Sequence, residues 1–347
     1  MLEPKPFATT AIGSVPYGSV AEALANASKL DIPATPQLVK INFWEDMFWS
    51  ALAGLPALLI NPAQRKIRAK RYWRENDLVD FYAKFLIGER DFLALSPEAS
   101  LSFEAFLQQA TQNPAFGPEF LKVQVIGPVT FGQMIQMEDG ESTLIDDPEL
   151  REVMALGLGG KAAWEAARIR ALGRIPVVFI DEPGLTSFGS AFSNLSADIV
   201  KETMNWVGAI IREDGPALIG CHVCGNTDWA MMMEMDLDII NFDAFTVMEQ
   251  FCLYPKQIRS FLERGGFIAW GIVPATSFSL NLSSDFLVRK LLDAWKGLEH
   301  NGVPGELLTG RALITTACGL GTLPEDLARA ATEMTSSVSR ILQERRG

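Results

Sequence analysis

A histidine and a cysteine near the middle of the chain are the residues best placed to bind a metal ion. They belong to the stretch Gly220-Cys221-His222-Val223-Cys224-Gly225-Asn226, which follows an apolar run typical of a buried strand. Side chains alternate between the two faces of a strand, so His222 and Cys224 point to one side and Cys221 to the other. His222 and Cys224 therefore offer a nitrogen and a sulfur to one point, which is half of a zinc site. Cys221 and Cys224 also match a Cys-x-x-Cys redox pair, but opposite faces of a strand keep their sulfur atoms apart.

Two further ligand candidates stand at the ends of other expected strands. Cys318 follows the apolar run 312–317, and Asp243 follows the run 237–242. Together with His222 and Cys224 they would complete a tetrahedral zinc site in which Asp243 supplies the oxygen ligand. Taken singly, each has another explanation, because Cys318 could be a buried core residue and Asp243 could cap the following helix.

Polar residues end two more of the expected strands. Ser14 comes shortly after the run 8–12, and Asp181 comes directly after the run 176–180. The carboxyl ends of the strands in a parallel α/β barrel converge on the mouth of the barrel, so we expect both residues near the zinc ligands. Asp181 could also be a structural carboxylate. The remaining cysteines and histidine have ordinary explanations: Cys221 and Cys252 as packing residues, and His300 as a surface residue at a helix C-terminus.

The elements that would position these residues are predominantly parallel strands. Most of the eight strand candidates are continuous aliphatic runs separated by helical patterns, which is typical of strands buried on both faces. They cover residues 8–12, 37–41, 122–126, 176–180, 217–224, 237–242, 267–272 and 312–317. This order predicts the α/β class and a (β/α)8 TIM barrel. We expect a single domain over residues 1–347 with a helical insertion at about 43–118. A doubly wound open sheet is the alternative, although no strand is followed by Gly-x-Gly-x-x-Gly.

The composition limits the partners and the compartment. The 347 residues carry a net charge of −12, with 48% apolar and 21% charged residues, which argues against nucleic acid or an anionic membrane as a partner. No stretch has the eighteen or so apolar residues of a membrane span, and the N-terminus lacks a signal-peptide pattern. Four cysteines do not make a disulfide framework, so we expect a cytoplasmic protein. A basic run at residues 65–74 is interpreted as a solvated helix face, with a docking patch for an acidic partner as the alternative.

Six short motifs in a fixed order resemble those of a known family. The resemblance is to the catalytic C-terminal half of cobalamin-independent methionine synthase, in the wider group that includes uroporphyrinogen decarboxylase and the zinc methylcobamide methyltransferases. It covers nearly the whole chain, and it rests on Thr9-Thr10-Ala11-Ile12-Gly13-Ser14, Gly127-Pro128-Val129-Thr130, Ile180-Asp181-Glu182-Pro183, His222-Val223-Cys224, Asp238-Ile239-Ile240-Asn241-Phe242-Asp243 and Cys318-Gly319-Leu320.

The resemblance implies a set of site residues. The implied zinc ligands are His222, Cys224, Asp243 and Cys318, with Asp243 at a position where the family has glutamate. Ile12, Ser14 and Asp181 would hold the carboxylate and amino group of homocysteine, and Asp181 would be the catalytic carboxylate. The family's glutamate for the substrate amino group has no match at residues 72–77. A zinc ion with two thiolates, one carboxylate and one imidazole has a net charge of −1, which suits activation of a substrate thiol better than activation of water.

The methyl donor is where the chain departs from the folate-dependent enzyme. That enzyme has a histidine after the seventh strand, whereas Trp270-Gly271-Ile272-Val273-Pro274 contains none. An amine leaving group such as folate needs a proton, and a cobalt(I) corrin does not. We therefore expect a zinc-dependent methyltransferase that converts homocysteine to methionine with a methylcorrinoid donor, bound to a partner corrinoid protein. The alternatives are methyltetrahydrofolate as donor, another thiol such as coenzyme M as acceptor, and a non-enzymatic zinc-containing corrinoid-binding protein. Tetrapyrrole decarboxylation is disfavoured, because that chemistry uses no zinc thiolate site.

Overall fold

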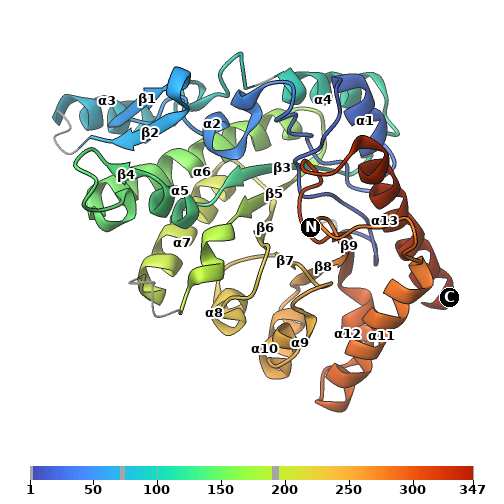
Figure 1. Cartoon of the computed structure of the whole chain (residues 1–347). Helices are drawn as coiled ribbons and strands as arrows, with labels where there is room; N and C mark the ends of the chain where they lie inside the picture. Colours follow the sequence, from blue (N-terminus) through green and yellow to red (C-terminus); the bar gives the residue numbers. More distant parts are fainter. Residues whose placement is uncertain (1–2, 71–74, 100, 190–194, 347) are drawn as a thin grey trace.

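Six parallel strands form the centre of the protein. The structure is a computed structural model that describes residues 3–70, 75–99, 101–189 and 195–346. The strands of the main sheet are hydrogen-bonded in chain order and form an arc (Figure 1). They are β3 (Phe120–Ile126), β5 (Ile175–Asp181), β6 (Leu218–Val223), β7 (Ile239–Phe242), β8 (Phe267–Val273) and β9 (Ala312–Thr316). All six are buried almost throughout, as their aliphatic sequences predict, and six of the predicted strands are thereby confirmed.

Helices connect successive strands and cover the outside of the arc (Figure 1). Those on the arc are α5 (Pro128–Met134), α6 (Pro148–Arg170), α7 (Ala197–Glu213), α8 (Trp229–Glu234), α9 (Met248–Phe251), α10 (Pro255–Glu263), α11 (Ser284–His300), α12 (Gly305–Gly310) and α13 (Glu325–Arg346). Local signals set where several begin: Asp147, Ser196 and Ser283 accept hydrogen bonds from backbone N–H groups of α6, α7 and α11. None of the helices in these described ranges combines the length and apolar character needed to cross a bilayer.

The prediction of eight regular barrel strands is wrong in the described residues, because the main sheet has six and its ladder does not close. Residues 8–12 and 37–41 do not form strands. The N-terminal chain instead lies between β9 and β3 through isolated bridges, such as Thr9 with Ile314 and Ala34 with Lys122. Pro33 and Pro36 have no N–H to donate to a ladder. Farther on, the carboxylate of Glu45 accepts the N–H of Leu38, and residues 39–41 turn.

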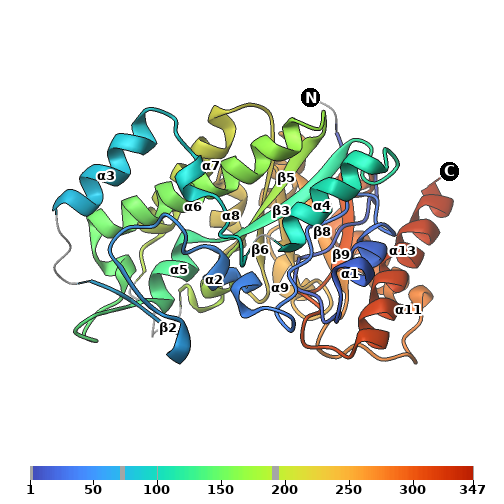
Figure 2. The ribbon, with the colours of Figure 1, turned by 90° about the horizontal axis from the view of Figure 1, so that it is seen from above.

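The N-terminal side also contains a small second sheet that was not predicted. The hairpin of β1 (Leu58–Asn61) and β2 (Lys66–Ala69) is extended by the short strand β4 (Gln136–Met137). The predicted insertion at about 43–118 therefore has a hairpin beside its helices α2 (Met47–Ser50), α3 (Glu75–Leu86) and α4 (Leu101–Gln112). Helix α1 (Val20–Ala27) precedes it. Figure 2 shows the hairpin and α3 at the opposite end of the molecule from α11 and α13.

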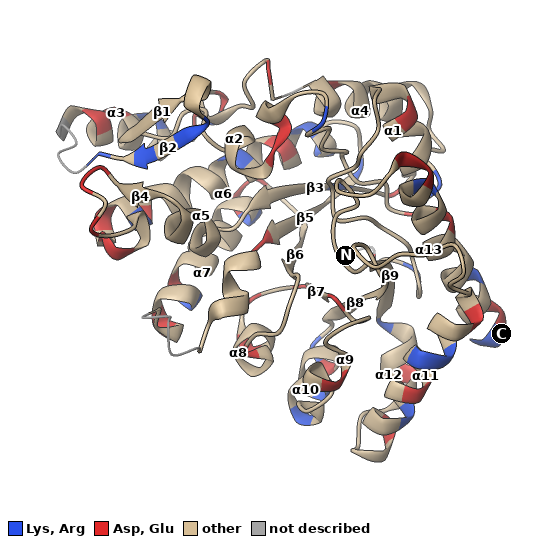
Figure 3. Ribbon diagram, viewed as in Figure 1, with Lys and Arg blue, Asp and Glu red and all other residues tan. Residues whose placement is uncertain are grey.

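The basic run belongs to this hairpin, so its interpretation as a helix face is wrong. Arg65 lies at the hairpin turn and Lys66 and Arg68 on β2, all exposed, and the strand is blue in Figure 3. The Arg65 guanidinium lies 4.8 Å from the ring centroid of Phe43. Arg71 and Arg74 lie outside the described residues.

Candidate metal and substrate site

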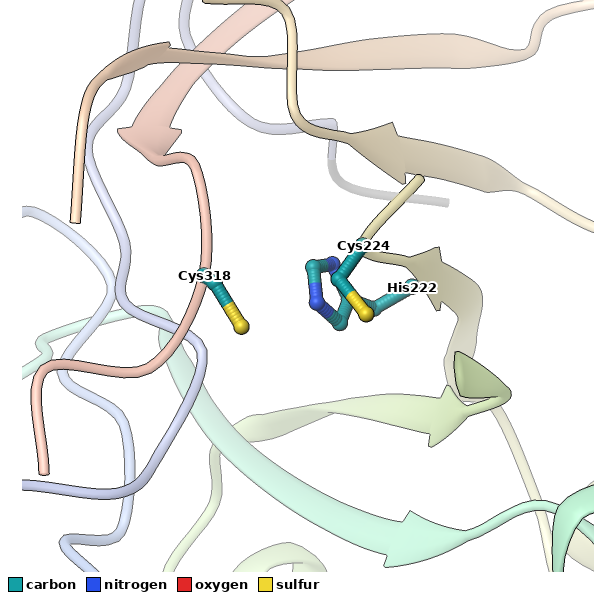
Figure 4. Close-up of side chains that lie close together, drawn as sticks. All are labelled: His222, Cys224 and Cys318. Carbon is teal, nitrogen blue, oxygen red and sulfur yellow. The ribbon is translucent and has the colours of Figure 1, made fainter. Parts of the chain in front are cut away.

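Three predicted ligands meet at the carboxyl ends of β6 and β9. The ligand atoms of His222, Cys224 and Cys318 all lie within 4.8 Å of one another. His222 belongs to β6, Cys224 directly follows that strand, and Cys318 belongs to the segment after β9. Figure 4 shows the Cys318 side chain approaching the other two from the opposite side of the same space. The fold thus brings together residues almost a hundred positions apart in the sequence, as the strand-end argument predicts.

The surroundings of His222 suit a metal ligand. Its side chain is 3% exposed, its Nδ1 lies 2.5 Å from Oδ1 of Asn241, and its Nε2 has no hydrogen-bond partner among the described residues. Burial lowers the pKa of His222 to about 4, so the imidazole is neutral at pH 7. A neutral imidazole with one nitrogen held and the other free is the form that binds a metal.

The two cysteines of the cluster interact directly. A hydrogen bond from Cys318, opposed by partial burial, lowers the pKa of Cys224 to about 7, and the same contact raises the pKa of Cys318. The two sulfur atoms are close enough for one divalent cation to bind both as thiolates. The donor set of one nitrogen and two sulfur atoms suits zinc. Cys221 is fully buried in the core behind the strand, and Cys252 packs against the same core, as predicted.

Asp243 lies near this cluster without joining it. Its Oδ1 accepts a hydrogen bond of 2.9 Å from the N–H of Thr246, which is the capping role considered as its alternative. Its negative charge still acts on Cys224, whose pKa it raises. The three-residue cluster does not include Asp243, so its role as the fourth zinc ligand stays a prediction.

A cavity of about 240 Å³ opens beside the cluster. Its wall contains the three metal-ligand candidates together with the predicted substrate residues Ile12, Ser14 and Asp181. Asp181 is 6% exposed, and its Oδ1 has no hydrogen-bond partner among the described residues. Burial raises the pKa of Asp181 to about 7, a shift that the charge of Lys122 opposes and that of Cys224 enhances. A buried carboxylate oxygen without a partner beside an open cavity is suited to receive a hydrogen-bond donor from a ligand.

The segment of Ile12 and Ser14 is held against the metal-ligand segment. The N–H of Leu320 donates to the carbonyl of Ser14 over 2.8 Å. A Cβ added to Gly319 would lie 2.0 Å from Oγ of Ser14, so glycine is required for this close approach. On β3, the fully buried Lys122 donates to the carbonyl of Ile12 over 2.8 Å.

Two of the recognised motifs are explained by one buried side chain. The carboxylate of Glu182 accepts hydrogen bonds from the N–H groups of Val129 and Thr130 and from the Thr130 hydroxyl. A Cβ at Gly127 would lie 2.0 Å from the carboxyl carbon of Glu182. The Glu182-Pro183-Gly184 segment therefore needs the Gly127-Pro128-Val129-Thr130 segment as its receptor, and the pair fixes the backbone next to Asp181.

Sequence reasoning missed three residues of the site. Asn241 interrupts the aliphatic strand β7, and a buried amide in such a run is a signal that could have identified it. Lys122 likewise interrupts the apolar run of β3. Asp46 lines the cavity from the N-terminal side, and no local pattern distinguishes it from an ordinary helix cap. His300, as predicted, is an exposed residue at the end of α11.

Comparison with known proteins agrees with this architecture. No protein-family model matches the chain, and no curated protein matches its sequence. Among solved structures, a B12-independent methionine synthase from Shewanella sp. W3-18-1 in complex with selenomethionine is similar, with a TM-score of 0.59, 14% identity and coverage of 98% of each chain. A methyltransferase from Methanosarcina mazei has a TM-score of 0.54 at 12% identity, over 97% of this chain and 95% of that one. The chain therefore shares its fold with this methionine synthase and this methyltransferase.

Proposed function

We propose that the protein is a zinc-dependent methyltransferase that methylates the sulfur of homocysteine to form methionine. The observation that carries the proposal is the convergence of His222, Cys224 and Cys318 beside an open cavity. A purely structural zinc site needs no cavity beside its ligands, whereas a catalytic one must be reachable by the substrate. The shared fold with a methionine synthase and a methyltransferase supports the same chemistry.

The ligand set favours a thiol substrate. When bound, zinc would supply the positive charge that lets a thiol lose its proton at neutral pH. His222 contributes no charge, and the two cysteines contribute one negative charge each as thiolates, so their sum balances the 2+ of the ion. Asp243 would add a further negative charge as the proposed fourth ligand. Such an electron-rich site is a weak activator of water and leaves a substrate sulfur nucleophilic.

The charges around the cavity favour an amino-acid thiol over an anionic one. The described wall residues include the carboxylates of Asp46 and Asp181, and they include no lysine or arginine. These carboxylates suit an ammonium group, and the Ser14 hydroxyl and neighbouring backbone N–H groups suit a carboxylate. Homocysteine has both groups. Coenzyme M has a sulfonate and no ammonium group, so it is the weaker candidate as acceptor.

The proposed methyl donor is a methylcorrinoid carried by a partner protein. In the transfer, the substrate sulfur forms a bond to the methyl carbon while the cobalt–carbon bond breaks and its electron pair stays on cobalt. No proton donor is needed for that leaving group. Transfer from methyltetrahydrofolate would need one at the departing nitrogen. The position where the folate enzyme has a histidine lies on β8, where Val273 is fully buried, and the chain has only one other histidine besides His222.

Methionine formation tests the proposal directly. Zinc-loaded protein is incubated with homocysteine and either methylcobalamin or methyltetrahydrofolate, and methionine is measured. We expect methionine from methylcobalamin, and none from a His222→Ala variant. Methionine formed only from methyltetrahydrofolate, and not from methylcobalamin, would show that the proposed methylcorrinoid donor is wrong. Stoichiometric zinc without methionine from either donor would favour the non-enzymatic alternative of a zinc-containing corrinoid-binding protein.

A further inference from the structure

Asn241 is a buried amide whose hydrogen-bonding groups are all engaged. It is fully buried, and the register of the sheet places it directly beside His222 on β6 and Ala269 on β8. Its Nδ2 donates to the carbonyl of Ala269 over 2.8 Å and to the Thr315 hydroxyl over 2.9 Å. The two amide hydrogens are therefore both used, on the side of the residue that faces β8 and β9.

These partners determine which way the amide points. A carbonyl oxygen only accepts hydrogen bonds, so the group of Asn241 that faces Ala269 must be the NH₂. The Thr315 hydroxyl donates its own hydrogen to the carbonyl of Thr316 over 2.9 Å, so it too can only accept from Asn241. The oxygen of the Asn241 amide must then face His222. This orientation follows from the neighbours and needs no assumption about the amide itself.

The orientation of the amide in turn decides the tautomer of His222. The distance between Oδ1 of Asn241 and Nδ1 of His222 is 2.5 Å, which requires a hydrogen between them. Since the oxygen has none, Nδ1 carries it. In a neutral ring the lone pair is then on Nε2, the nitrogen without a partner among the described residues.

We propose that Asn241 is a positioning residue that holds His222 as the Nδ1–H tautomer and thereby presents Nε2 to the metal ion. The inference rests on the zinc site of the proposed function, and it does not depend on the identity of the methyl donor or acceptor. Groups of this kind, hydrogen-bonded to a metal-binding histidine, typically change metal affinity 10- to 100-fold when they are removed.

The tautomer can be read directly, because the chain has only two histidines. In metal-free protein labelled with ¹⁵N-histidine, the ring nitrogens of exposed His300 serve as an internal reference for those of His222. We expect His222 to show a protonated Nδ1 and an unprotonated Nε2. An Asn241→Leu variant, which cannot accept a hydrogen bond, should show a mixture of tautomers. A protonated Nε2 in the unaltered protein would overturn the proposal.

Zinc affinity gives a second, independent test. In competition with a chelator, Asn241→Leu should weaken zinc binding roughly 10- to 100-fold. Asn241→Asp keeps an acceptor oxygen for Nδ1, so its zinc affinity should stay within a few-fold of the unaltered protein even where Asn241→Leu fails to fold. Equal zinc affinity of folded Asn241→Leu, or a loss in Asn241→Asp as large as that in Asn241→Leu, would overturn the proposal.

A second buried asparagine is the matched control. Asn26 is 7% exposed, and its Nδ2 donates to the Thr332 hydroxyl over 2.7 Å on the N-terminal side of the protein. Asn26→Leu should lower the thermal stability through the same loss of a buried hydrogen bond and leave the His222 signals and the zinc affinity unchanged. Methionine formation is not a readout here, so a failure of the proposed function is distinguishable from a failure of this inference.

Discussion

The arc from β3 to β9 and the N-terminal side, residues 7–69, contribute to the same cavity in different ways. The arc is a regular ladder, and the three metal-ligand candidates come from its strand ends. The N-terminal side is joined to the arc by isolated bridges and single hydrogen bonds, and it supplies cavity residues such as Ile12, Ser14 and Asp46. In the proposed site, the metal-ligand candidates thus come from the regular ladder, and two of the three predicted substrate residues, Ile12 and Ser14, come from the part with fewer backbone constraints.

The largest expected effect comes from breaking the arc's part of the site. Cys318→Ser removes one of the two candidate thiolate ligands, so zinc content should fall from about one ion per chain to near zero, and methionine formation should fall about 100-fold or more. Metal analysis and the methionine assay measure the two effects. Cys252→Ser, at a half-buried cysteine packed against the core, is the control and should retain zinc. Full zinc content in Cys318→Ser would refute the metal site.

An intermediate effect is expected where the two regions meet. Glu165 of α6 is 6% exposed and faces a cavity of about 30 Å³ shared with Glu45 and Gln124. Burial raises its pKa to about 8, against an ordinary value of 4.5. As the pH rises, the Glu165 carboxyl loses its proton near pH 4.5 in the unfolded chain and only near pH 8 in the folded chain. The folded state therefore loses stability as the pH rises from about 4.5 to about 8.

Glu165→Gln should remove that loss. The difference in free energy of unfolding between the variant and the unaltered protein should shift in favour of the variant by a few kcal/mol from pH 5 to pH 8. One pH unit corresponds to about 1.4 kcal/mol. Urea unfolding at the two pH values measures the change. The exposed Glu249→Gln is the control and should show a constant difference. Parallel stability curves for Glu165→Gln and the unaltered protein would contradict a buried neutral carboxyl at this junction.

The smallest expected effect tests the contact between the Ser14 segment of the N-terminal side and the metal-ligand segment after β9. Gly319→Ala would place a methyl group 2.0 Å from Oγ of Ser14, so the Ser14 segment must shift. We expect the KM for homocysteine to rise roughly tenfold, equivalent to about 1.4 kcal/mol, while zinc stays stoichiometric. Gly297→Ala, with no atoms within 4 Å of the added group, is the control and should leave KM unchanged. A normal KM in Gly319→Ala would mean that Ser14 does not position the substrate.

The sequence by itself determined the arc and the metal-ligand candidates. Its strands are continuous aliphatic runs, and that pattern is local, so six of them were recognisable before any packing was known. The placement of His222, Cys224 and Cys318 followed from the alternation of side chains along a strand and from the convergence of parallel strand ends. Both rules depend on backbone geometry that neighbouring elements do not alter.

Only the tertiary structure decided how the N-terminal side is built and how the site is held. Residues 8–12 and 37–41 read as strands, yet each depends on partners that are distant in the sequence, and the prolines between them prevent a full ladder. The contacts of Asn241 with Ala269 and Thr315, and of Ser14 with Gly319, are likewise long-range. A hydrogen bond or close approach between residues dozens or hundreds of positions apart leaves no periodic signal in the sequence, because its geometry exists only once the chain has folded.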